Sequence, residues 1–391
     1  MSREVPEGWQ LKSLGEVMDF QNGFAFKPAD WCSSGLPIVR IQNLNGGGDF
    51  NFYDGYVPPQ FGIKSGDILF CWSGSRGTSF GPRRWKGGEG WLNQHIFRCD
   101  LKPDIDDGFA FYLLEHLTKA IEQAAHGGAG LVHIKKSELI KFQAMMPPPH
   151  EQRRIAEILS SVDEAVVATR AVIEQTRKVK QGVLERLLTK GIGHTHFKRT
   201  EIGEMPEAWR VISYGEIFKL SSGKLKSVKS LAPERSDTSP YPAYGGNGIA
   251  GYTEEYLVDE DLIVIGRVGE YCGAAYRSSG KAWITDNALY TKEFMADVDR
   301  DFIAYAFSRV PLKYIRGGGG QPLVSQSAIY TQVLGLPSLG EQKKIVEILK
   351  SFHSSERDLQ LPNLVEIKSA LMSDLLTGRK RVSDALPLAA E

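Results

Sequence analysis

Residues Pro147–Leu159 read PPPHEQRRIAEIL, and residues Pro337–Leu349 read PSLGEQKKIVEIL. Glu, Gln, Ile, Glu, Ile and Leu recur at the same relative positions, and the Arg-Arg pair becomes Lys-Lys. A repeat of this kind indicates a chain built by duplication. The two stretches therefore predict two similar halves, each ending in a long helix.

Each copy carries the signals of a helix start and a long apolar stripe. Prolines precede it, and Glu151 and Glu341 fall in the first turn, where negative charge suits the helix dipole. The first copy continues with residues that recur every seven positions. One line contains Ile155, Val162, Thr169, Thr176 and Val183, and a second contains Ile158, Ala165, Val172 and Val179. Leu159, Val166, Ile173 and Leu187 widen this apolar stripe. Such heptads predict a coiled coil. A helix of about 40 residues reaches roughly 60 Å, so it needs a long partner, and the second copy is the obvious one.

The rest of each half repeats as a frame around dissimilar segments. Glu4–Trp9 returns as Glu204–Trp209, and Trp91–His95 returns as Trp283–Asn287. Short strands are followed by Gly/Arg loops at 73–77 and 266–269, which we take as equivalent, and short helices are expected near 109–123 and 302–309. Glycine-rich loops then precede Leu131-Val132 and Leu323-Val324. The repeated motifs and the dissimilar segments between them predict that the two halves bind different ligands.

The second long helix differs from the first. Pro362 falls inside its apolar pattern and should break or kink it. Gly191 and Gly378 follow the last apolar residues of the two helices and should stop them. The expected domains are 1–146, a central helix 147–192, 193–336, a distal helix 337–380 and a tail 381–391.

Composition narrows the class of protein. The chain has 391 residues and a formal net charge of zero, which argues against a histone-like DNA binder but leaves room for local basic patches. Cys32, Cys71, Cys99 and Cys272 form no zinc-ligand spacing, and scattered thiols fit a reducing cytoplasm. No apolar run is long enough for a membrane span. We expect a cytoplasmic protein without a metal site.

No catalytic constellation is found. Gly246–Gly251 fits the dinucleotide pattern GxGxxG, but neither a buried strand before it nor a helical pattern after it is clear, so a tight turn or a DNA-facing loop is favoured. The acidic residues at 104–107 are typical of a solvated turn. The chain has no ATP-binding P-loop, no HExxH and no Asn-Pro-Pro-aromatic tetrapeptide.

Nucleic-acid contacts are better supported. Arg, Lys, Asn and Gln can pair with base edges or reach phosphates, and in the first half they are interleaved with aromatic residues. Each single residue is also compatible with a solvated surface position, and His133 with a structural histidine. The predicted DNA-binding residues are Arg76, Arg83, Arg84, Asn93, Gln94, His133, Lys135, Asn247, Arg267, Tyr271, Asn287, Arg316 and Gln321.

Taken together, the duplicated Glu-Gln helix, its Leu-Leu-Thr ending and the loops Tyr244–Ile249, Ile265–Gly269 and Trp283–Asn287 resemble the specificity (S) subunit of Type I restriction–modification systems. The resemblance covers essentially the whole chain. It implies an α+β fold: two mixed α/β target-recognition domains separated by two long helices in an antiparallel coiled coil, with an internal pseudo-twofold repeat. Each domain is then expected to read one half of a bipartite, asymmetric site in double-stranded DNA.

The same resemblance implies a non-catalytic chain whose partners do the chemistry. Two modification subunits carry S-adenosylmethionine and methylate adenine N6, and restriction subunits use ATP and Mg²⁺; no cofactor is expected in this chain. The predicted subunit-binding residues are Glu151, Gln152, Ile155, Ile158, Leu159, Glu341, Gln342, Ile345, Ile348 and Leu349. Charge reversal at Ile158 or Leu159 is expected to release the modification subunits. The alternatives are a coiled-coil scaffold without DNA specificity and an enzyme using the GxGxxG loop.

Overall fold

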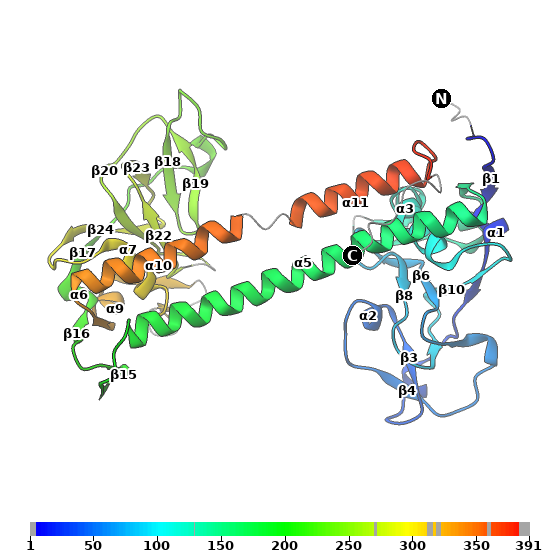
Figure 1. Ribbon diagram of the computed structural model, residues 1–391, viewed down its shortest axis with the longest axis horizontal. Helices are drawn as coiled ribbons and strands as arrows, with labels where there is room; N and C mark the ends of the chain where they lie inside the picture. The colour runs from blue at the N-terminus through cyan, green and yellow to red at the C-terminus, as the bar shows by residue number, and fades with distance from the viewer. Residues whose placement is uncertain are drawn as a thin grey trace. The chain divides into compact units, whose positions relative to one another are not determined.

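The computed structural model describes residues 5–128, 130–269, 272–310, 316–317, 322–357 and 361–382 (Figure 1). The chain forms two compact units. Unit 1 consists of Met1–Ala171 with Gln360–Glu391, and unit 2 consists of Val172–Leu359. The helix α5 (Pro149–Lys190) contributes its first part to unit 1 and its last part to unit 2. Among the described residues, no helix is both long and apolar enough to cross a membrane.

Unit 1 is built on a central sheet of order β2-β10-β6-β8 and an outer sheet of order β4-β3-β9-β5, with two small sheets, β1-β13 and β11-β12-β7. Its strands are β1 (Gln10–Ser13), β2 (Met18–Asn22), β3 (Leu36–Val39), β4 (Asn51–Tyr53), β5 (Gly62–Ile63), β6 (Ile68–Cys71), β7 (Ser73–Ser75), β8 (Gly81–Arg84), β9 (Gly90–Leu92), β10 (Ile96–Leu101), β11 (His126–Gly127), β12 (Leu131–His133) and β13 (Gln143–Met146). Its helices are α1 (Leu14–Val17), η1 (Pro28–Asp30), α2 (Ile41–Leu44), η2 (Pro59–Phe61), α3 (Asp107–Ala124), α4 (Lys136–Leu139), the first part of α5, and α11 (Leu361–Leu375).

Unit 2 repeats this plan, with a central sheet β17-β24-β21-β22, an outer sheet β19-β18-β23-β20, and the pairs β16-β27 and β25-β26. A hairpin, β14-β15, lies before β16 in the chain. The strands are β14 (Phe197–Thr200), β15 (Gly203–Pro206), β16 (Arg210–Ser213), β17 (Phe218–Ser222), β18 (Tyr241–Gly245), β19 (Gly248–Thr253), β20 (Val258–Asp259), β21 (Leu262–Gly266), β22 (Ala275–Ser278), β23 (Lys281–Ile284), β24 (Ala288–Phe294), β25 (Arg316–Gly317), β26 (Leu323–Val324) and β27 (Val333–Leu336). The helices are α6 (Tyr214–Ile217), η3 (Val228–Ser230), α7 (Arg300–Phe307), α9 (Gln326–Tyr330) and α10 (Leu339–Arg357).

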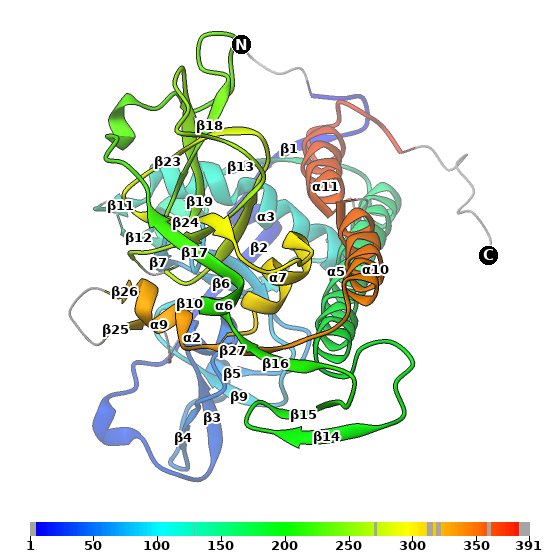
Figure 2. The same cartoon turned by 90° about the vertical axis from the view of Figure 1, so that its left-hand side faces the viewer.

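The strand registers show how closely the halves correspond. Trp91 pairs with Ile38 of the parallel strand β3, and Trp283 pairs with Ala243 of the parallel strand β18. The helices expected near 109–123 and 302–309 are present as α3 and α7. The predicted mixed α/β character and the internal repeat are therefore confirmed. The outer sheet of each unit lies away from that unit's long helices in both views (Figures 1 and 2).

The long helices are part of the hydrophobic core of each unit. In unit 1, Ile155 and Leu159 of α5 and Met372 of α11 are buried in one cluster with Phe20 and Phe109. In unit 2, Leu187 of α5 and Ile345 of α10 are buried with Tyr214, Phe218 and Phe302. The amphipathic stripes of the helices thus stabilise the domains directly, through removal of apolar surface from water.

A buried glutamate fastens the start of each repeated helix to its domain. Glu151, only 2% exposed, accepts hydrogen bonds from Trp9 Nε1 (2.9 Å) and from Arg381 Nε and Nη2 (2.9 and 3.0 Å). Burial raises the pKa of Glu151, but the hydrogen bonds from Arg381 and Trp9 outweigh it and bring the pKa below 4.5. The Glu151 carboxylate therefore joins the start of the helix to the domain, in addition to its favourable interaction with the helix dipole.

Unit 2 repeats this arrangement with one partner exchanged. Glu341 accepts from Trp209 Nε1 (3.0 Å) and from the Ile192 backbone N–H (3.0 Å), and it lies 2.9 Å from His194 Nε2. The neighbouring glutamines are also equivalent: Gln152 receives the Asp106 N–H, and Gln342 receives the Asp299 N–H. Since each glutamine also donates to a proline carbonyl, the Glu-Gln motif holds domain and helix together.

Both predicted glycine stops are confirmed. Gly191 and Gly378 have φ of +63° and +69°, a left-handed conformation that glycine adopts without strain. A Cβ on Gly191 would lie 2.7 Å from the Trp209 ring, and one on Gly378 would lie 2.5 Å from Pro6 Cγ. Glycine is needed at both positions because the backbone is left-handed and because a side chain would collide with Trp209 or Pro6 of the adjoining domain.

The stripe on α5 is narrower than predicted. The seam contains Ile155, Leu159, Val166 and Leu187, all buried. The predicted line through Ile158 and Val179 instead turns outward, because Val172 and Val179 are exposed. The alternation of three- and four-residue steps along 155, 159, 162, 166, 169 and 173 explains this, since those positions share one face of a helix.

The distal helix predicted for 337–380 occurs as two helices, in line with the break or kink expected at Pro362. In the described residues α10 ends at Arg357 and α11 begins at Leu361, which makes Pro362 the second residue of α11. A proline is tolerated in a first turn because the backbone N–H there has no acceptor in the helix. Within unit 1, Asp163 pairs with Lys368 (2.8 Å) and Glu151 with Arg381, so α11 runs antiparallel to the first part of α5.

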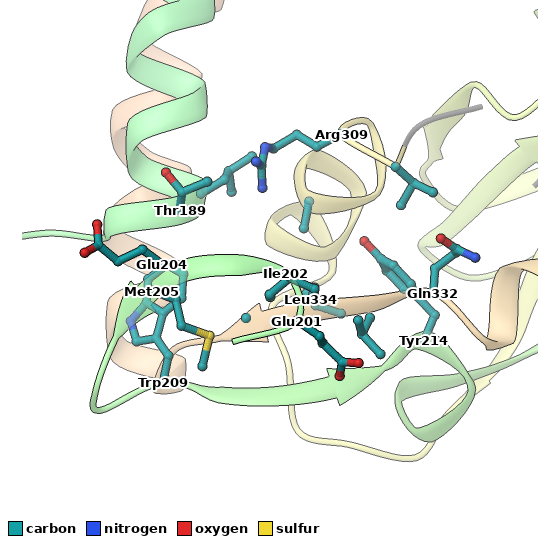
Figure 3. A pocket seen from close by; sticks show the side chains of 15 residues that line it. Thr189, Glu201, Ile202, Glu204, Met205, Trp209, Tyr214, Arg309, Gln332 and Leu334 are labelled. Atoms are coloured by element: carbon teal, nitrogen blue, oxygen red, sulfur yellow. The ribbon is translucent and has the colours of Figure 1, made fainter. Parts of the chain in front are cut away.

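A pocket of about 370 Å³ lies in unit 2 against the β14-β15 hairpin (Figure 3). Tyr214 lines this pocket, between Arg309 and Gln332 in the view, and its hydroxyl oxygen is buried. The ring is fully buried, the hydroxyl has no hydrogen-bond partner among the described residues, and burial raises the pKa of the phenol. Arg309 is engaged with both carboxylate oxygens of Glu185 (2.5 and 2.7 Å).

Tyr214→Phe is therefore expected to raise the free energy of unfolding of unit 2 by about 1 kcal/mol, since a buried hydroxyl without a partner costs roughly 1–3 kcal/mol. Urea unfolding followed by tryptophan fluorescence measures the change. Tyr112→Phe is the matched control, because that hydroxyl donates to Asp163 (2.8 Å), and its loss should lower stability. Destabilisation by Tyr214→Phe would contradict the account and indicate a water acceptor in the pocket.

Candidate nucleic-acid interface

In unit 2, loops from four strand ends converge around Thr285. Lys224, just after β17, forms a β-bridge with Thr285, and the Thr285 N–H donates to the Tyr244 carbonyl at the end of β18 (2.9 Å). The Arg267 N–H, just after β21, donates to the carbonyl of Asn287 (2.9 Å). Polar residues far apart in the sequence are thereby brought to one place.

A glycine allows this convergence in both units. A Cβ on Gly223 would lie 2.1 Å from the Thr285 carbonyl oxygen, and a Cβ on Gly23 would lie 2.1 Å from the Asn93 carbonyl oxygen. No side chain fits at such a distance, so only glycine permits the close approach. The repeat of Gly23 and Gly223 in the sequence has this structural cause.

The convergence brings together three predicted DNA-binding residues of unit 2. Arg267 directs Nη1 toward Ser222 Oγ (3.4 Å), and the side chains of Asn247 and Asn287 are exposed. The Tyr276 hydroxyl donates to Asn247 Oδ1 (3.2 Å), which orients that amide. Exposed amides and a guanidinium on adjoining loops form the donor and acceptor set that reads base edges.

Positive charge lies beside these groups. Lys224 and Lys229 are exposed and form no ion pair within the described part of the chain, and Leu225 between them is 81% exposed. Lys226, by contrast, is paired with Glu255 (2.8 Å) and lies over the Trp283 ring. An unpaired lysine at the loop cluster, such as Lys224, suits a phosphate contact, while an exposed apolar group such as Leu225 suits the thymine methyl.

Arg316 has a different environment. Its Nε and Nη2 donate to the Cys272 carbonyl (3.0 and 2.9 Å). It belongs to β25, whose partner strand residue Val324 donates its N–H to the Arg267 carbonyl (2.9 Å). Arg316 therefore supports the loop that carries Arg267. The predicted contacts Tyr271 and Gln321 lie outside the described residues.

Unit 1 builds the same convergence with other side chains. Phe24 forms the β-bridge to Asn93, and the Asn93 N–H donates to the Val39 carbonyl (3.1 Å). Gln94 is half-buried and His95 is exposed, as expected for readers, but Asn93 is buried beneath them. Asn93 and its counterpart Thr285 thus lie at the base of the loops.

The predicted equivalence of the Arg76 and Arg267 loops is wrong. Cys71 pairs with Ile96 in unit 1, and Gly266 pairs with Ala288 in unit 2, so the counterpart of Arg267 is Trp72. Trp72 stacks on Phe97 (5.7 Å between ring centres) and donates to the Gln94 carbonyl (3.1 Å). The matching Gly/Arg composition of the two loops hid a shift of several residues.

The two apolar dipeptides that follow the glycine-rich loops, Leu131-Val132 and Leu323-Val324, do not occupy equivalent positions. The Ile134 N–H donates to the Trp72 carbonyl as the Val324 N–H does to the Arg267 carbonyl (2.9 Å in both). Ile134 is therefore the counterpart of Val324, and His133 that of Leu323. His133 is exposed on β12, and Lys135 is exposed just before α4.

The predicted arginines of unit 1 do not form one group. Arg76 is exposed but donates to the Glu122 carbonyl (2.5 Å), and Arg83 turns toward Asn45 Oδ1 (3.3 Å). Arg84 pairs with Asp107 (2.6 Å) and lies over the Phe111 ring, in a groove against α5. Arg84 therefore joins the domain to its helices. Arg40, which sequence patterns did not single out, lies at the convergence, directly after β3.

Other chemistry has little support in the structure. Gly246–Gly251 forms the turn between β18 and β19 and the first residues of β19, with no helix after it, as the favoured turn interpretation predicted. A dinucleotide site needs that helix. No group of three or more His, Cys, Asp or Glu side chains suited to a metal ion occurs within the part of the chain that the structure describes.

The predicted subunit-binding residues are mostly internal. Glu151, Gln152, Ile155, Leu159, Gln342, Ile345 and Leu349 are buried, and Glu341 is held by Trp209. They join the helices to their own domains and are not available on a docking surface. Ile158 is half-buried and Ile348 is 37% exposed. Among the described side chains, the large apolar residues that are exposed on the long helices are Val167, Val172, Val179, Ile348, Val365 and Ile367.

Comparison with known proteins shows the family. The model of the Type I restriction modification DNA specificity domain matches residues 6–175 and 206–366. The MjaVIII specificity subunit of Methanocaldococcus jannaschii is 27% identical over 97% of this chain and 95% of its own length. The EcoKI specificity subunit of Escherichia coli K12 is 22% identical over 88% and 82%.

Solved structures agree on the fold. The S subunit of a Type I restriction–modification system from M. genitalium matches with a TM-score of 0.59 at 20% identity, over 96% of this chain and 97% of its own. A chain from a study of Type I system assembly and conformational transition matches with a TM-score of 0.62 at 15% identity, over 97% and 100%. The chain belongs to the Type I restriction–modification specificity subunit family, and it carries two copies of the DNA specificity domain.

Proposed function

We propose that each unit reads one half of a bipartite, asymmetric site in double-stranded DNA. The observation that carries this proposal is the loop convergence built twice on one frame with different side chains. Arg267, Asn287 and Leu323 of unit 2 occupy the positions of Trp72, His95 and His133 in unit 1. Equivalent positions with unlike donors and acceptors suit unlike base sequences.

The chain acts in this proposal as a reader and scaffold without chemistry of its own. Its relatives are named specificity subunits. The long helices act as a spacer between the two readers and dock two modification subunits, through which the restriction subunits join. S-adenosylmethionine, ATP and Mg²⁺ belong to those partners. Adenine within a duplex must leave the base stack before its N6 can be methylated, and the modification subunits would perform that step.

The outward apolar residues of the helices support the docking part of the proposal. Val167 and Val365 line a groove of about 950 Å³ in unit 1, together with Phe111 and Val166. Val167 is 66% exposed. Exposed apolar side chains that follow a helix face are typical of a surface that receives a partner helix. We extend the predicted subunit-binding surface, which includes Ile158 and Ile348, to Val167 and Val365.

Exchanging residues 1–145 for the corresponding domain of another specificity subunit tests the reading role. The chimera, co-expressed with the modification subunit, is expected to methylate a site with one new and one unchanged half. A chimera with a replaced unit 2 domain, residues 193–336, is the matched control and should alter only the other half. An unchanged site in both chimeras, with intact complexes, would favour the alternative of a coiled-coil scaffold without DNA specificity.

A further inference from the structure

Arg40 is placed at the convergence of loops in unit 1. Val39 pairs with Leu92 in the parallel part of the outer sheet, as Tyr244 pairs with Ile284 in unit 2. Arg40 therefore corresponds to Gly245, which begins the turn that carries Asn247. Since the halves differ in sequence here, the comparison of motifs gave no signal for Arg40.

The guanidinium of Arg40 is held in place without an acceptor. It stacks over the Trp31 ring, with Cζ 4.8 Å from the ring centre. Its Nε is buried and has no hydrogen-bond partner, and among the described residues no carboxylate lies within ion-pair distance. Arg84 and Arg98, by comparison, pair with Asp107 and Asp100. The buried Nε is closed to solvent, whereas Nη1 and Nη2 also have no hydrogen-bond partner among the described residues, so these two donors are available to an acceptor supplied from outside.

The backbone that carries Arg40 is fixed. Asn43 is buried, and its Oδ1 accepts the Arg40 N–H (3.0 Å) while its Nδ2 donates to the carbonyls of Gly47 and Asp49 (3.3 and 3.0 Å). The loop after β3 is thereby closed on itself. A planar fork on a fixed loop, stacked on an aromatic ring, is arranged for bidentate recognition before any ligand arrives.

Unit 2 places its guanidinium elsewhere in the same frame. There Arg267 occupies the position that Trp72 fills in unit 1, and Gly245 stands where unit 1 has Arg40. Arg40 and Arg267 thus lie at the loop clusters of their units, at different strand ends. Two readers with displaced arginines would recognise different positions in their half-sites.

We infer that Arg40, positioned by Trp31 and Asn43, is a specificity-determining residue of unit 1 that reads a base edge with two acceptors, as guanine presents through O6 and N7. The inference rests on the proposed function, because it assigns a base contact within the first half-site. Guanine is the base that arginine contacts most often in the major groove. A phosphate also offers paired acceptors, and it carries no sequence information.

The test uses the full chain, co-expressed with its modification subunit, and long-read mapping of methylated adenine. Arg40→Ala is expected to relax preference at one base pair of the first half-site by at least about tenfold, with the second half-site unchanged. Arg40→Lys keeps the charge but lacks the fork, so it should not restore the preference. Lys64→Ala, at an exposed loop of unit 1, is the control and should leave the motif unchanged.

The outcomes separate the inference from the proposed function. A folded Arg40→Ala variant with an unchanged motif, or with methylation reduced equally at every site as for a phosphate contact, would overturn the inference alone. A wild-type complex that methylates without a split motif would overturn the proposed function as well. Thermal unfolding of Arg40→Ala, with a midpoint expected to be no lower than that of the wild type, confirms that the variant is folded.

Discussion

Leu159→Asp is expected to unfold unit 1, with a loss of more than about 4 kcal/mol of stability. Leu159 is 0% exposed and lies in the core with Ile155, Phe109 and Met372. A carboxylate in that core has no partner to compensate its lost hydration. Circular dichroism and limited proteolysis of the purified chain measure the effect.

Val167→Asp, eight residues further along the same helix, is the matched control. Its side chain is 66% exposed, so the chain should stay folded, but co-purification of the modification subunit should be lost. Because Leu159 is buried, it is not available to dock a partner, contrary to what the sequence predicts. Normal folding of Leu159→Asp would contradict the packing of α5, and full co-purification by Val167→Asp would contradict the proposed docking face.

Glu151→Ala is expected to lower the stability of unit 1 by about 3 kcal/mol. The substitution leaves the buried Trp9 Nε1 without its acceptor and removes the charge-assisted hydrogen bonds from Arg381. Denaturant unfolding gives the change. Glu157→Ala on the same helix is the control: its carboxylate is exposed and pairs with Arg154 (3.0 Å), so about 0.5 kcal/mol or less is expected. Equal effects of the two substitutions would contradict the account.

The pH dependence of stability gives an independent check on Glu151. Its folded-state pKa lies below the ordinary value of 4.5. The unfolded chain therefore binds a proton more readily at acid pH, and the stabilisation is complete above about pH 4.5 and is lost as the pH falls through the folded pKa. The difference in stability between wild type and Glu151→Gln should narrow below that pH. A constant difference down to pH 3 would argue against the carboxylate pair.

The sequence predicts the features that repeat themselves. The Glu-Gln stretches, the Trp9 and Trp209 segments and the two glycine stops each occur twice, and the structure confirms the duplicated α+β frame and the helix ends. A sequence repeat does not show which residues each motif contacts, and the structure supplies these contacts. Glu151 follows the helix-start pattern, but its partner Arg381 lies 230 residues away.

The loop cluster was predicted less well, for two physical reasons. The Gly/Arg loops match one another in composition, which predicts that Arg76 corresponds to Arg267, whereas the strand register places Trp72 at the position of Arg267. A side chain's direction also depends on which face of a strand it leaves: Arg83 and Arg84 are neighbours, yet only Arg84 meets α3 and the groove of α5. Arg40 lies where the halves have no similarity, so only its position beside Asn93 identifies it.

Long-read mapping of N6-methyladenine tests the central claim most directly. DNA is taken from cells that express this chain with its modification subunit and compared with DNA from cells that express the modification subunit alone. The account predicts methylation at a split motif, with two unlike defined halves around a spacer of fixed length, only when the chain is present. Methylation at a single continuous motif, or without sequence preference, by an intact complex would contradict it.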